Sequence, residues 1–323
     1  MRAMRAEGFG GYGDLKFVEV AKPTVSDGRV LVRMTASGVT PLEHTILTGH
    51  FPPAKAPLIL GSEGAGIIEE GGDSQFPNGS RVMFTGAYGV FENGTYSEWL
   101  SVKKDHLCLI PGNIDSNVAA GIPVAYSTAY LALRAAGFAA GKTVLAPAIG
   151  GSVGNAVTQL AMALGAKHAI STTTNHEKAE QARKHGFSEI IDMTQETLTA
   201  GVRRIAGDAG VDIIVDAIGG GILSEALSTL GQGGSLTTLG YSAGRKSTID
   251  VTDLIWKGAS IKSFMLFSQT PDAWAEFWTA VTALLKAGRI KPIIAKTFDL
   301  KEAPAALRHL VEDRPFGRVI LTA

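Results

Sequence analysis

The sequence predicts an α/β protein in which a helix-covered parallel sheet is joined to a smaller, β-rich domain. Short apolar or alternating runs, bounded by turn residues, fill the first third of the chain. From residue 143 onward, strand-like runs alternate with helical stripes. The chain has 323 residues, of which 45% are hydrophobic and 19% charged, so it can form two globular domains.

The first third is expected to hold short strands and one short helix. Each run is bounded by Gly, Pro, Asp or Asn, which favour turns. We expect strands at 15–20, 29–37, 64–70, 81–84 and 96–102, and a helix at 42–47.

The middle of the chain alternates between the two kinds of element, which implies a parallel sheet with right-handed crossovers. Strands are expected at 143–146, 167–171, 189–191, 211–217 and 235–239, with helices near 153–164, 176–185, 197–206 and 222–230. Two helices (near 273–287 and 301–312) and two short strands (293–298 and 318–321) follow. We therefore expect residues 121–267 to be inserted in a β-rich domain made of 1–120 and 268–323.

The composition excludes several classes of partner. The formal net charge is zero, so there is no electrostatic reason to expect nucleic acid or an anionic membrane as the partner. Cys108 is the only cysteine, so neither an internal disulfide nor a cysteine-rich zinc lobe is possible. No apolar segment resembles a signal peptide or reaches the roughly 20 residues of a membrane span. The expectation is a soluble cytoplasmic protein.

A glycine turn joins the first strand of the parallel sheet to its helix. Residues 148–154 read Ala-Ile-Gly-Gly-Ser-Val-Gly, which fits the spacing A-x-x-G-x-x-G. Such a turn needs small residues because the backbone bends sharply and approaches a pyrophosphate closely. The helix N-terminus then offers N–H groups and partial positive charge to the phosphates. The pattern predicts a Rossmann-type dinucleotide site, with its contacts at Gly151, Ser152, Val153 and Gly154.

The same residues also match G-x-S-x-G, the nucleophile elbow of α/β-hydrolases. In that interpretation Ser152 is the nucleophile, Asp216 the acid and His309 the base, in the right chain order. No HGGG-like oxyanion loop precedes the elbow. The hydrolase is therefore the weaker alternative.

The loop after the second strand indicates which dinucleotide binds. NAD sites usually place Asp or Glu at this strand end, on the ribose 2′-hydroxyl. Here Thr173, Thr174 and Lys178 offer hydroxyl groups and a positive charge, which suit a 2′-phosphate. Thr174 and Glu177 also fit a capping box for the next helix. The loop predicts NADPH over NADH.

Several motifs in order resemble the zinc-independent medium-chain dehydrogenases/reductases of the quinone oxidoreductase (ζ-crystallin-like) type. Besides the glycine turn, they are Ala-Ser-Gly-Val-Thr-Pro at 36–41, Leu-Gly-Ser-Glu-Gly-Ala-Gly at 60–66, Gly-Thr-Tyr-Ser-Glu at 94–98, Ser-Thr-Ala-Tyr at 127–130, Asp-Ala-Ile-Gly-Gly at 216–220 and Phe-Gly-Arg-Val-Ile-Leu at 316–321. The resemblance covers nearly the whole chain. It implies a Rossmann domain with a GroES-like domain, NADPH as cofactor, and a homodimer through an edge near 260–267.

The residue types at the family's metal positions argue against zinc. Zinc alcohol dehydrogenases of this superfamily use Cys, His and Cys, and this chain has Thr40, Ser62 and Val124 at the matching positions. Neutral hydroxyls and a valine do not replace thiolate and imidazole on Zn²⁺. Without a Lewis acid, alcohol oxidation is not expected. Electron-poor quinones and α,β-unsaturated carbonyls are the expected hydride acceptors.

The resemblance also implies further cofactor contacts. Thr128 is expected near the nicotinamide or its ribose, and Arg318 near the adenosine phosphate. The remaining contacts lie at or after later strand ends, at Ile218, Gly240, Tyr241, Phe264, Leu266 and Phe267. By residue type alone, the aromatic residues here are more often core, and Arg318 is more often a surface ion-pair residue.

The acceptor side is less well specified. Relatives usually have Asn and Asp where this chain has Thr40 and Glu43, so the substrate preference stays open. Glu43, His44 and Phe267 are expected near the acceptor, with Thr40 and Tyr126 orienting it by hydrogen bonds. The proton donor is not identified. A non-enzymatic NADPH-binding protein remains a further alternative, which turnover with any acceptor would exclude.

Overall fold

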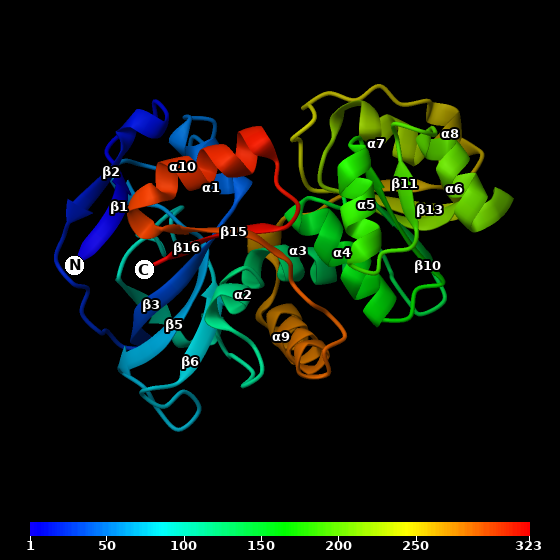
Figure 1. Ribbon diagram of the computed structural model, residues 1–323. Helices are drawn as coiled ribbons and strands as arrows, with labels where there is room; N and C mark the ends of the chain where they lie inside the picture. Colours follow the sequence, from blue (N-terminus) through cyan, green and yellow to red (C-terminus); the bar gives the residue numbers. More distant parts are fainter. The chain divides into compact units, whose positions relative to one another are not determined.

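The computed structural model describes all residues, Met1–Ala323, and confirms the α/β class (Figure 1). It divides into a β-rich unit (Met1–Val124 with Pro292–Ala323) and a parallel-sheet unit (Ala125–Lys291). The chain returns to the β-rich unit at Pro292 instead of the expected 268. Helix α9 (Pro271–Lys286) accounts for the difference, because its Phe277 packs on Tyr130 within the parallel-sheet unit, at 6.0 Å between ring centroids.

The β-rich unit contains a three-stranded and a seven-stranded sheet, mostly antiparallel. The small sheet has the order β2-β1-β4, from β1 (Arg2–Ala6), β2 (Leu15–Glu19) and β4 (Leu58–Ile59). The large one has the order β15-β16-β3-β5-β6-β8, with β7 also pairing with β3. Its strands are β3 (Arg29–Val39), β5 (Glu63–Glu70), β6 (Arg81–Thr85), β7 (Trp99–Lys103), β8 (Leu107–Leu109), β15 (Ile294–Asp299) and β16 (Arg318–Thr322).

The period of two along β3 explains how the large sheet buries one face. Val30, Val32 and Met34 alternate along the strand and pack with Phe84 and Val102 of neighbouring strands. Short helices complete the unit: α1 (Pro41–Leu47), α2 (Ser116–Ala120) and α10 (Ala303–Arg308). The longer α3 (Pro123–Ala135) begins at the boundary between the units. The sequence prediction missed β1, β4 and β8, which are short or weakly patterned.

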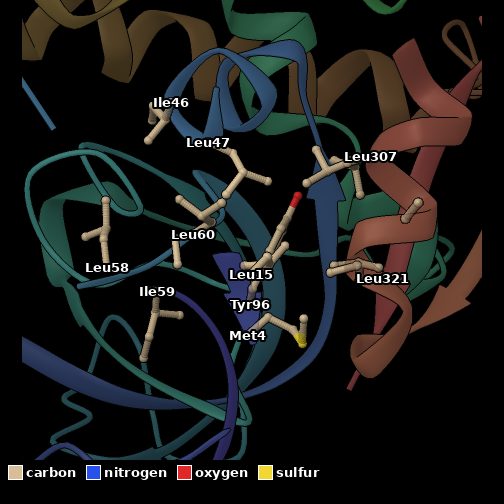
Figure 2. Packing of buried hydrophobic residues seen from close by; sticks show 14 of the residues in the cluster. Met4, Leu15, Ile46, Leu47, Leu58, Ile59, Leu60, Tyr96, Leu307 and Leu321 are labelled. Atoms are coloured by element: carbon tan, nitrogen blue, oxygen red, sulfur yellow. The ribbon is translucent and has the colours of Figure 1, made fainter. Parts of the chain in front are cut away.

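A second apolar cluster fills the space between the small sheet, α1 and α10 (Figure 2). Tyr96 lies among its aliphatic side chains, fully buried, and its hydroxyl group has no hydrogen-bond partner. Burial raises the pKa of Tyr96, so the phenol stays neutral. An unpaired buried hydroxyl group destabilises a fold.

Replacing Tyr96 with phenylalanine is expected to raise the free energy of unfolding by about 1 kcal/mol, because the unpaired hydroxyl group is removed. Tyr88 is the matched control: it is equally buried, but its hydroxyl group bonds to His106 Nδ1 (2.9 Å) and accepts from Lys103 N (2.9 Å). Tyr88→Phe is expected to lower the free energy by about 1–2 kcal/mol. Urea unfolding measures both. Equal losses in the two variants would contradict the assignment.

The parallel-sheet unit has six strands in the order β11-β10-β9-β12-β13-β14, with every pair parallel. They are β9 (Thr143–Ala146), β10 (His168–Thr173), β11 (Ile190–Asp192), β12 (Val211–Asp216), β13 (Leu230–Thr238) and β14 (Ser260–Ser263). This is the doubly wound order 3-2-1-4-5-6 of the Rossmann fold. The strand β14, short and polar, was missed by the sequence prediction.

Helices connect these strands (Figure 1), and the alternation of patterns predicted all of them except the short helix at 251–255. They are α4 (Ser152–Ala163), α5 (His176–Lys184), α6 (Leu198–Ala206), α7 (Gly220–Leu227) and α8 (Val251–Ile255). Leu198 of α6 and Leu227 of α7 belong to one buried cluster with Leu145, Ile170 and Ile214 of the central strands. The apolar strands are thus covered by amphipathic helices. None of the helices is both long and apolar enough to span a membrane.

Candidate dinucleotide and acceptor sites

The carboxyl ends of the parallel strands lie along one edge of the sheet, because all six strands run the same way. Open α/β sheets bind ligands at this edge. The loops that follow the strands here hold six of the predicted cofactor residues: Gly151, Thr174, Ile218, Gly240, Tyr241 and Phe264. The parallel-sheet unit therefore contains all the residues that the sequence placed around the dinucleotide except Arg318.

The glycine turn is tightly folded against its neighbours. Ala148, at its first position, has a φ of 66°, a left-handed conformation that residues other than glycine seldom adopt. Ile149 N donates to Thr172 O (2.9 Å), which fixes the turn to the end of β10. A Cβ atom on Gly154 would lie 2.4 Å from both the Pro147 and the Ala148 carbonyl oxygens. Only glycine fits there, because helix α4 packs directly on the turn.

Gly151 differs from Gly154 in what surrounds it. A Cβ atom on Gly151 would lie 3.3 Å from Ala148 O, which is a close contact but far looser than the 2.4 Å contacts at Gly154. Gly151 is also the N-cap of the twelve-residue helix α4 and makes no side-chain capping bond. Gly151 thus provides no side-chain cap of its own to the first N–H groups of α4, which is the arrangement found at pyrophosphate sites. Ser152 and Val153 form the first turn of this helix, and the residues fit a dinucleotide.

The loop after β10 caps its helix with Asn175 instead of the predicted Thr174, and the helix begins at residue 176 as predicted. The N-cap of α5 is Asn175, whose Oδ1 accepts from Lys178 N (3.0 Å). Thr174 is exposed and does not cap the helix, so its predicted capping box is wrong. Asn175 is as good a capping residue as threonine, so the residue types alone did not decide between them. Thr173 is buried and accepts from Asn175 N (3.2 Å), and Lys178 is half-buried on the first turns of α5.

The arrangement of the hydrolase residues argues against that alternative. The Asp216 carboxylate accepts from the N–H groups of Ile218 and Gly219 in its own loop, each at 3.1 Å. His309 lies in the β-rich unit and pairs with Asp313 (2.7 Å). Asp216 and His309 thus each have local hydrogen-bond partners, which argues against the roles of acid and base in a serine triad.

In the β-rich unit, one buried carboxylate collects four hydrogen bonds. Glu43 of α1 accepts from Thr40 N (2.7 Å) and Thr40 Oγ1 (2.6 Å) at Oε2, and from Ser62 N (3.0 Å) and Ser62 Oγ (2.7 Å) at Oε1. All three side chains are buried. Burial raises the pKa of Glu43, and these hydrogen bonds oppose the rise. The cluster is a closed network between α1 and the start of β5.

This network changes the predicted roles of two residues. The hydroxyl groups of Thr40 and Ser62 both donate to Glu43. A hydroxyl group has one proton to donate, so neither can donate to a second acceptor at the same time. Thr40 therefore does not donate to an acceptor as predicted, and Glu43 is an internal partner instead of a substrate contact. The fit to zinc also fails: Thr40, Ser62 and Val124 offer two neutral hydroxyl groups and an aliphatic side chain.

Arg318 forms a buried ion pair with Glu63. Its guanidinium contacts Glu63 Oε1, and Glu63 Oε2 accepts from Val124 N (2.7 Å). Arg318 and Glu63 are 4% and 0% exposed, so this guanidinium is not available to a phosphate, and the predicted adenosine contact is wrong. Burial raises the pKa of Glu63 to about 7, against the opposing charge of Arg318. The sequence offered no signal for this pair, whose members are separated by 255 positions.

The other predicted site residues lie as follows. Tyr126 and Thr128 are buried on α3. His44 Nδ1 bonds to Tyr12 Oη (3.0 Å), and burial lowers the pKa of His44. Phe264, Leu266 and Phe267 follow β14 and are not core residues: the first two are half-buried, and Phe267 is 43% exposed.

Fold and site together define a two-unit α/β protein with a nucleotide-type turn, and comparisons place it among known proteins. The family model for the alcohol dehydrogenase GroES-like domain matches residues 26–112, and that for zinc-binding dehydrogenase matches residues 152–283. Human quinone oxidoreductase is 31% identical over 99% of this chain and 97% of its own length. A quinone oxidoreductase of Pseudomonas aeruginosa is 28% identical, with 97% of each chain covered.

Solved structures agree with the sequence comparisons. Escherichia coli quinone oxidoreductase complexed with NADPH has a TM-score of 0.88 at 26% identity, and all of each chain is covered. A mycobacterial protein complexed with NADPH has the same TM-score and identity, again with complete coverage of both chains. The chain belongs to the quinone oxidoreductase family of medium-chain dehydrogenases/reductases, a family of oxidoreductases.

Proposed function

We propose that this protein is an NADPH-dependent reductase that transfers hydride to a quinone or an α,β-unsaturated carbonyl without zinc. The observation that supports it most is the start of α4, where the glycine turn leads directly into the helix and the N-cap residue, Gly151, makes no side-chain capping bond. Names of relatives agree with it: human quinone oxidoreductase is similar over nearly the whole chain, and two similar structures hold NADPH.

The chain's own residues would bind and orient the cofactor, which supplies the hydride. Gly151, Ser152, Val153 and Gly154 would hold the pyrophosphate. Around the 2′-phosphate we propose Thr173, Thr174 and Lys178, and around the nicotinamide half Thr128, Ile218, Gly240, Tyr241, Phe264 and Leu266. A fluorescence titration tests the choice of cofactor: NADPH should bind more tightly than NADH, and comparable affinities would contradict the proposal.

The residue types at Thr40 and Ser62 favour quinones and α,β-unsaturated carbonyls as hydride acceptors. Hydroxyl groups that donate to Glu43 do not polarise an alcohol as a zinc ion does. Quinones and enones need no such help, because conjugation spreads the charge that the hydride delivers. Substrate contacts are proposed at His44 and Phe267. NADPH consumption with quinones, enals, enones and enoyl thioesters tests the activity. Tight NADPH binding with no turnover would favour a non-enzymatic binding protein instead.

Tyr126 remains the proposed hydrogen-bond donor to the acceptor. Tyr126→Phe is expected to lower kcat/KM by more than about twofold, since a hydrogen bond made in the transition state is lost. Tyr130 is a matched control on the same helix, because its hydroxyl group donates to Glu276 of α9 (2.9 Å). Steady-state kinetics of both variants measure the difference. If Tyr126→Phe retains kcat/KM within twofold, the role is wrong.

We also propose a homodimer through the free edge of β14. Beyond β13 this strand has no further neighbour, and exposed apolar side chains lie along or near it, among them Ile261 (37%), Met265 (65%) and Trp256 (75%). Ile261→Lys is expected to convert the dimer to a monomer, because a charge on the strand resists edge pairing. Light scattering after gel filtration measures the mass. A wild-type monomer, or an unchanged variant dimer, would contradict this interface.

A further inference from the structure

Asp216 closes β12 and holds the turn that follows. Its side chain is fully buried, and its two carboxylate oxygens both lie 3.1 Å from Gly219 N. One of these oxygens also accepts from Ile218 N (3.1 Å), and the other from Thr238 Oγ1 of β13 (3.3 Å). A buried carboxylate with several N–H donors forms strong, charge-assisted bonds. Asp216 thus determines where the N–H groups of this turn point.

A second loop, residues 240–247 after β13, interlocks with that turn. Ala243 N donates to Ile218 O (2.8 Å), and Gly220 N donates to Gly244 O (3.1 Å). The hydroxyl group of Ser247 donates to Gly220 O (2.8 Å). The two loops are therefore joined by hydrogen bonds in both directions.

Their contact is backbone against backbone, because glycines line it on both sides. A Cβ atom on Gly219 would lie 2.6 Å from Gly244 O, and one on Gly220 would lie 2.6 Å from Ala243 O. Both glycines also have positive φ, at 69° and 60°. A Cβ atom on Gly240 would meet Ala217 O at 2.2 Å. Such close backbone contact permits only one arrangement of the 217–220 turn and the 240–247 loop. That arrangement depends on the conformation of the turn, which Asp216 fixes by its hydrogen bonds.

We propose that Asp216 is a positioning residue for the dinucleotide site: it fixes the 217–220 turn and, through it, the 240–247 loop. The proposal rests on the proposed function, since Ile218, Gly240 and Tyr241 are the cofactor contacts of these two segments. Without the carboxylate, the N–H groups of Ile218 and Gly219 lose their acceptor, and the turn opens to satisfy them. The expected consequence is weaker cofactor binding, with the chemical step largely unchanged.

Asp216→Asn tests this, because an amide keeps the shape but has one acceptor oxygen and turns an N–H group toward another N–H group. Ser247→Ala removes the hydrogen bond that the 240–247 loop donates to Gly220 O, with little risk to folding. Asp250→Asn is the control: Asp250 also accepts from a backbone N–H group (Thr252 N, 2.9 Å) and a threonine hydroxyl group (2.7 Å), but at the exposed cap of α8.

Two measurements are made on the full-length protein: hydrogen exchange of the free protein, and NADPH dissociation constants with kcat and KM. Asp216→Asn is expected to speed amide exchange in 217–220 and 240–247 and to weaken NADPH binding about tenfold, with kcat within about twofold. Ser247→Ala should act in the same direction but less strongly, and Asp250→Asn should change neither measurement.

Unchanged exchange in both segments in Asp216→Asn would overturn the proposal, as would faster exchange with unchanged NADPH affinity. If Asp216→Asn fails to fold, Ser247→Ala decides by the same two criteria. If the wild-type protein does not bind NADPH, the proposed function fails, and the exchange data still show whether Asp216 fixes the two loops.

Discussion

Gly154→Ala is expected to lower the free energy of unfolding by about 3 kcal/mol and to weaken NADPH binding by about 100-fold or more. The added Cβ atom would lie 2.4 Å from two backbone carbonyl oxygens, and backbone cannot move aside as a flexible side chain can. Helix α4 must therefore shift away from the turn, and its N-terminus moves with it. Urea unfolding and fluorescence titration measure the two effects.

Gly151→Ala separates binding from stability. Its Cβ atom would lie 3.3 Å from Ala148 O, a close contact that a shift of a few tenths of an ångström relieves, and its φ of −82° suits alanine. The free energy of unfolding is expected to change by less than about 1 kcal/mol, while NADPH binding weakens about 100-fold, because the methyl group faces the approaching pyrophosphate. Unchanged NADPH affinity in a folded Gly151→Ala protein would contradict the assignment of the turn.

Arg318→Met is expected to destabilise the protein by about 3–5 kcal/mol at pH 8, and by much less at pH 5. The replacement leaves the Glu63 carboxylate buried without its counter-charge. The folded-state pKa of Glu63, already raised to about 7, rises further when Arg318 is removed. A group with a raised folded pKa stabilises the fold below its unfolded pKa, and loses that contribution as the pH rises through the folded pKa.

The destabilisation should therefore grow with pH as Glu63 is forced to ionise in the variant. Unfolding by urea from pH 5 to 8, compared with the wild type at each pH, isolates this contribution from other titrating groups. The double variant Glu63→Gln with Arg318→Met is the control, since neither position of the pair then carries a charge and the pH dependence that the pair causes should disappear. A loss that is equal at every pH would show that packing, and not the ion pair, is what Arg318 supplies.

The parallel-sheet unit was largely predictable, because its signals are local. Each strand and the helix after it differ in hydrophobic period, and the glycine spacing at 148–154 reflects the steric limit now seen at Gly154. The unit boundary at Pro292 could not be predicted in this way. The pattern of α9 predicts a helix, but it does not say on which unit that helix packs. The N-cap of α5 differed by one residue because Thr174 and Asn175 are both capable caps.

The acceptor side was less predictable, because its contacts join residues far apart in the chain. Nothing near Arg318 in sequence indicates that it is buried against Glu63. Residue type alone argued against Thr40 and Ser62 as zinc ligands, but only the structure shows that both hydroxyl groups donate to Glu43. Asp216 stood out in the sequence through the hydrolase motif, and the structure gives it a different role.

The most direct test of the proposed function is anaerobic NADPH oxidation, followed at 340 nm, across a panel of quinones, enals and enones. The proposal predicts turnover with at least one of these acceptors, with one NADPH consumed for each two-electron reduction, and slower turnover in Gly151→Ala at limiting NADPH. An absence of NADPH oxidation with every acceptor, in a protein that binds NADPH, would contradict it.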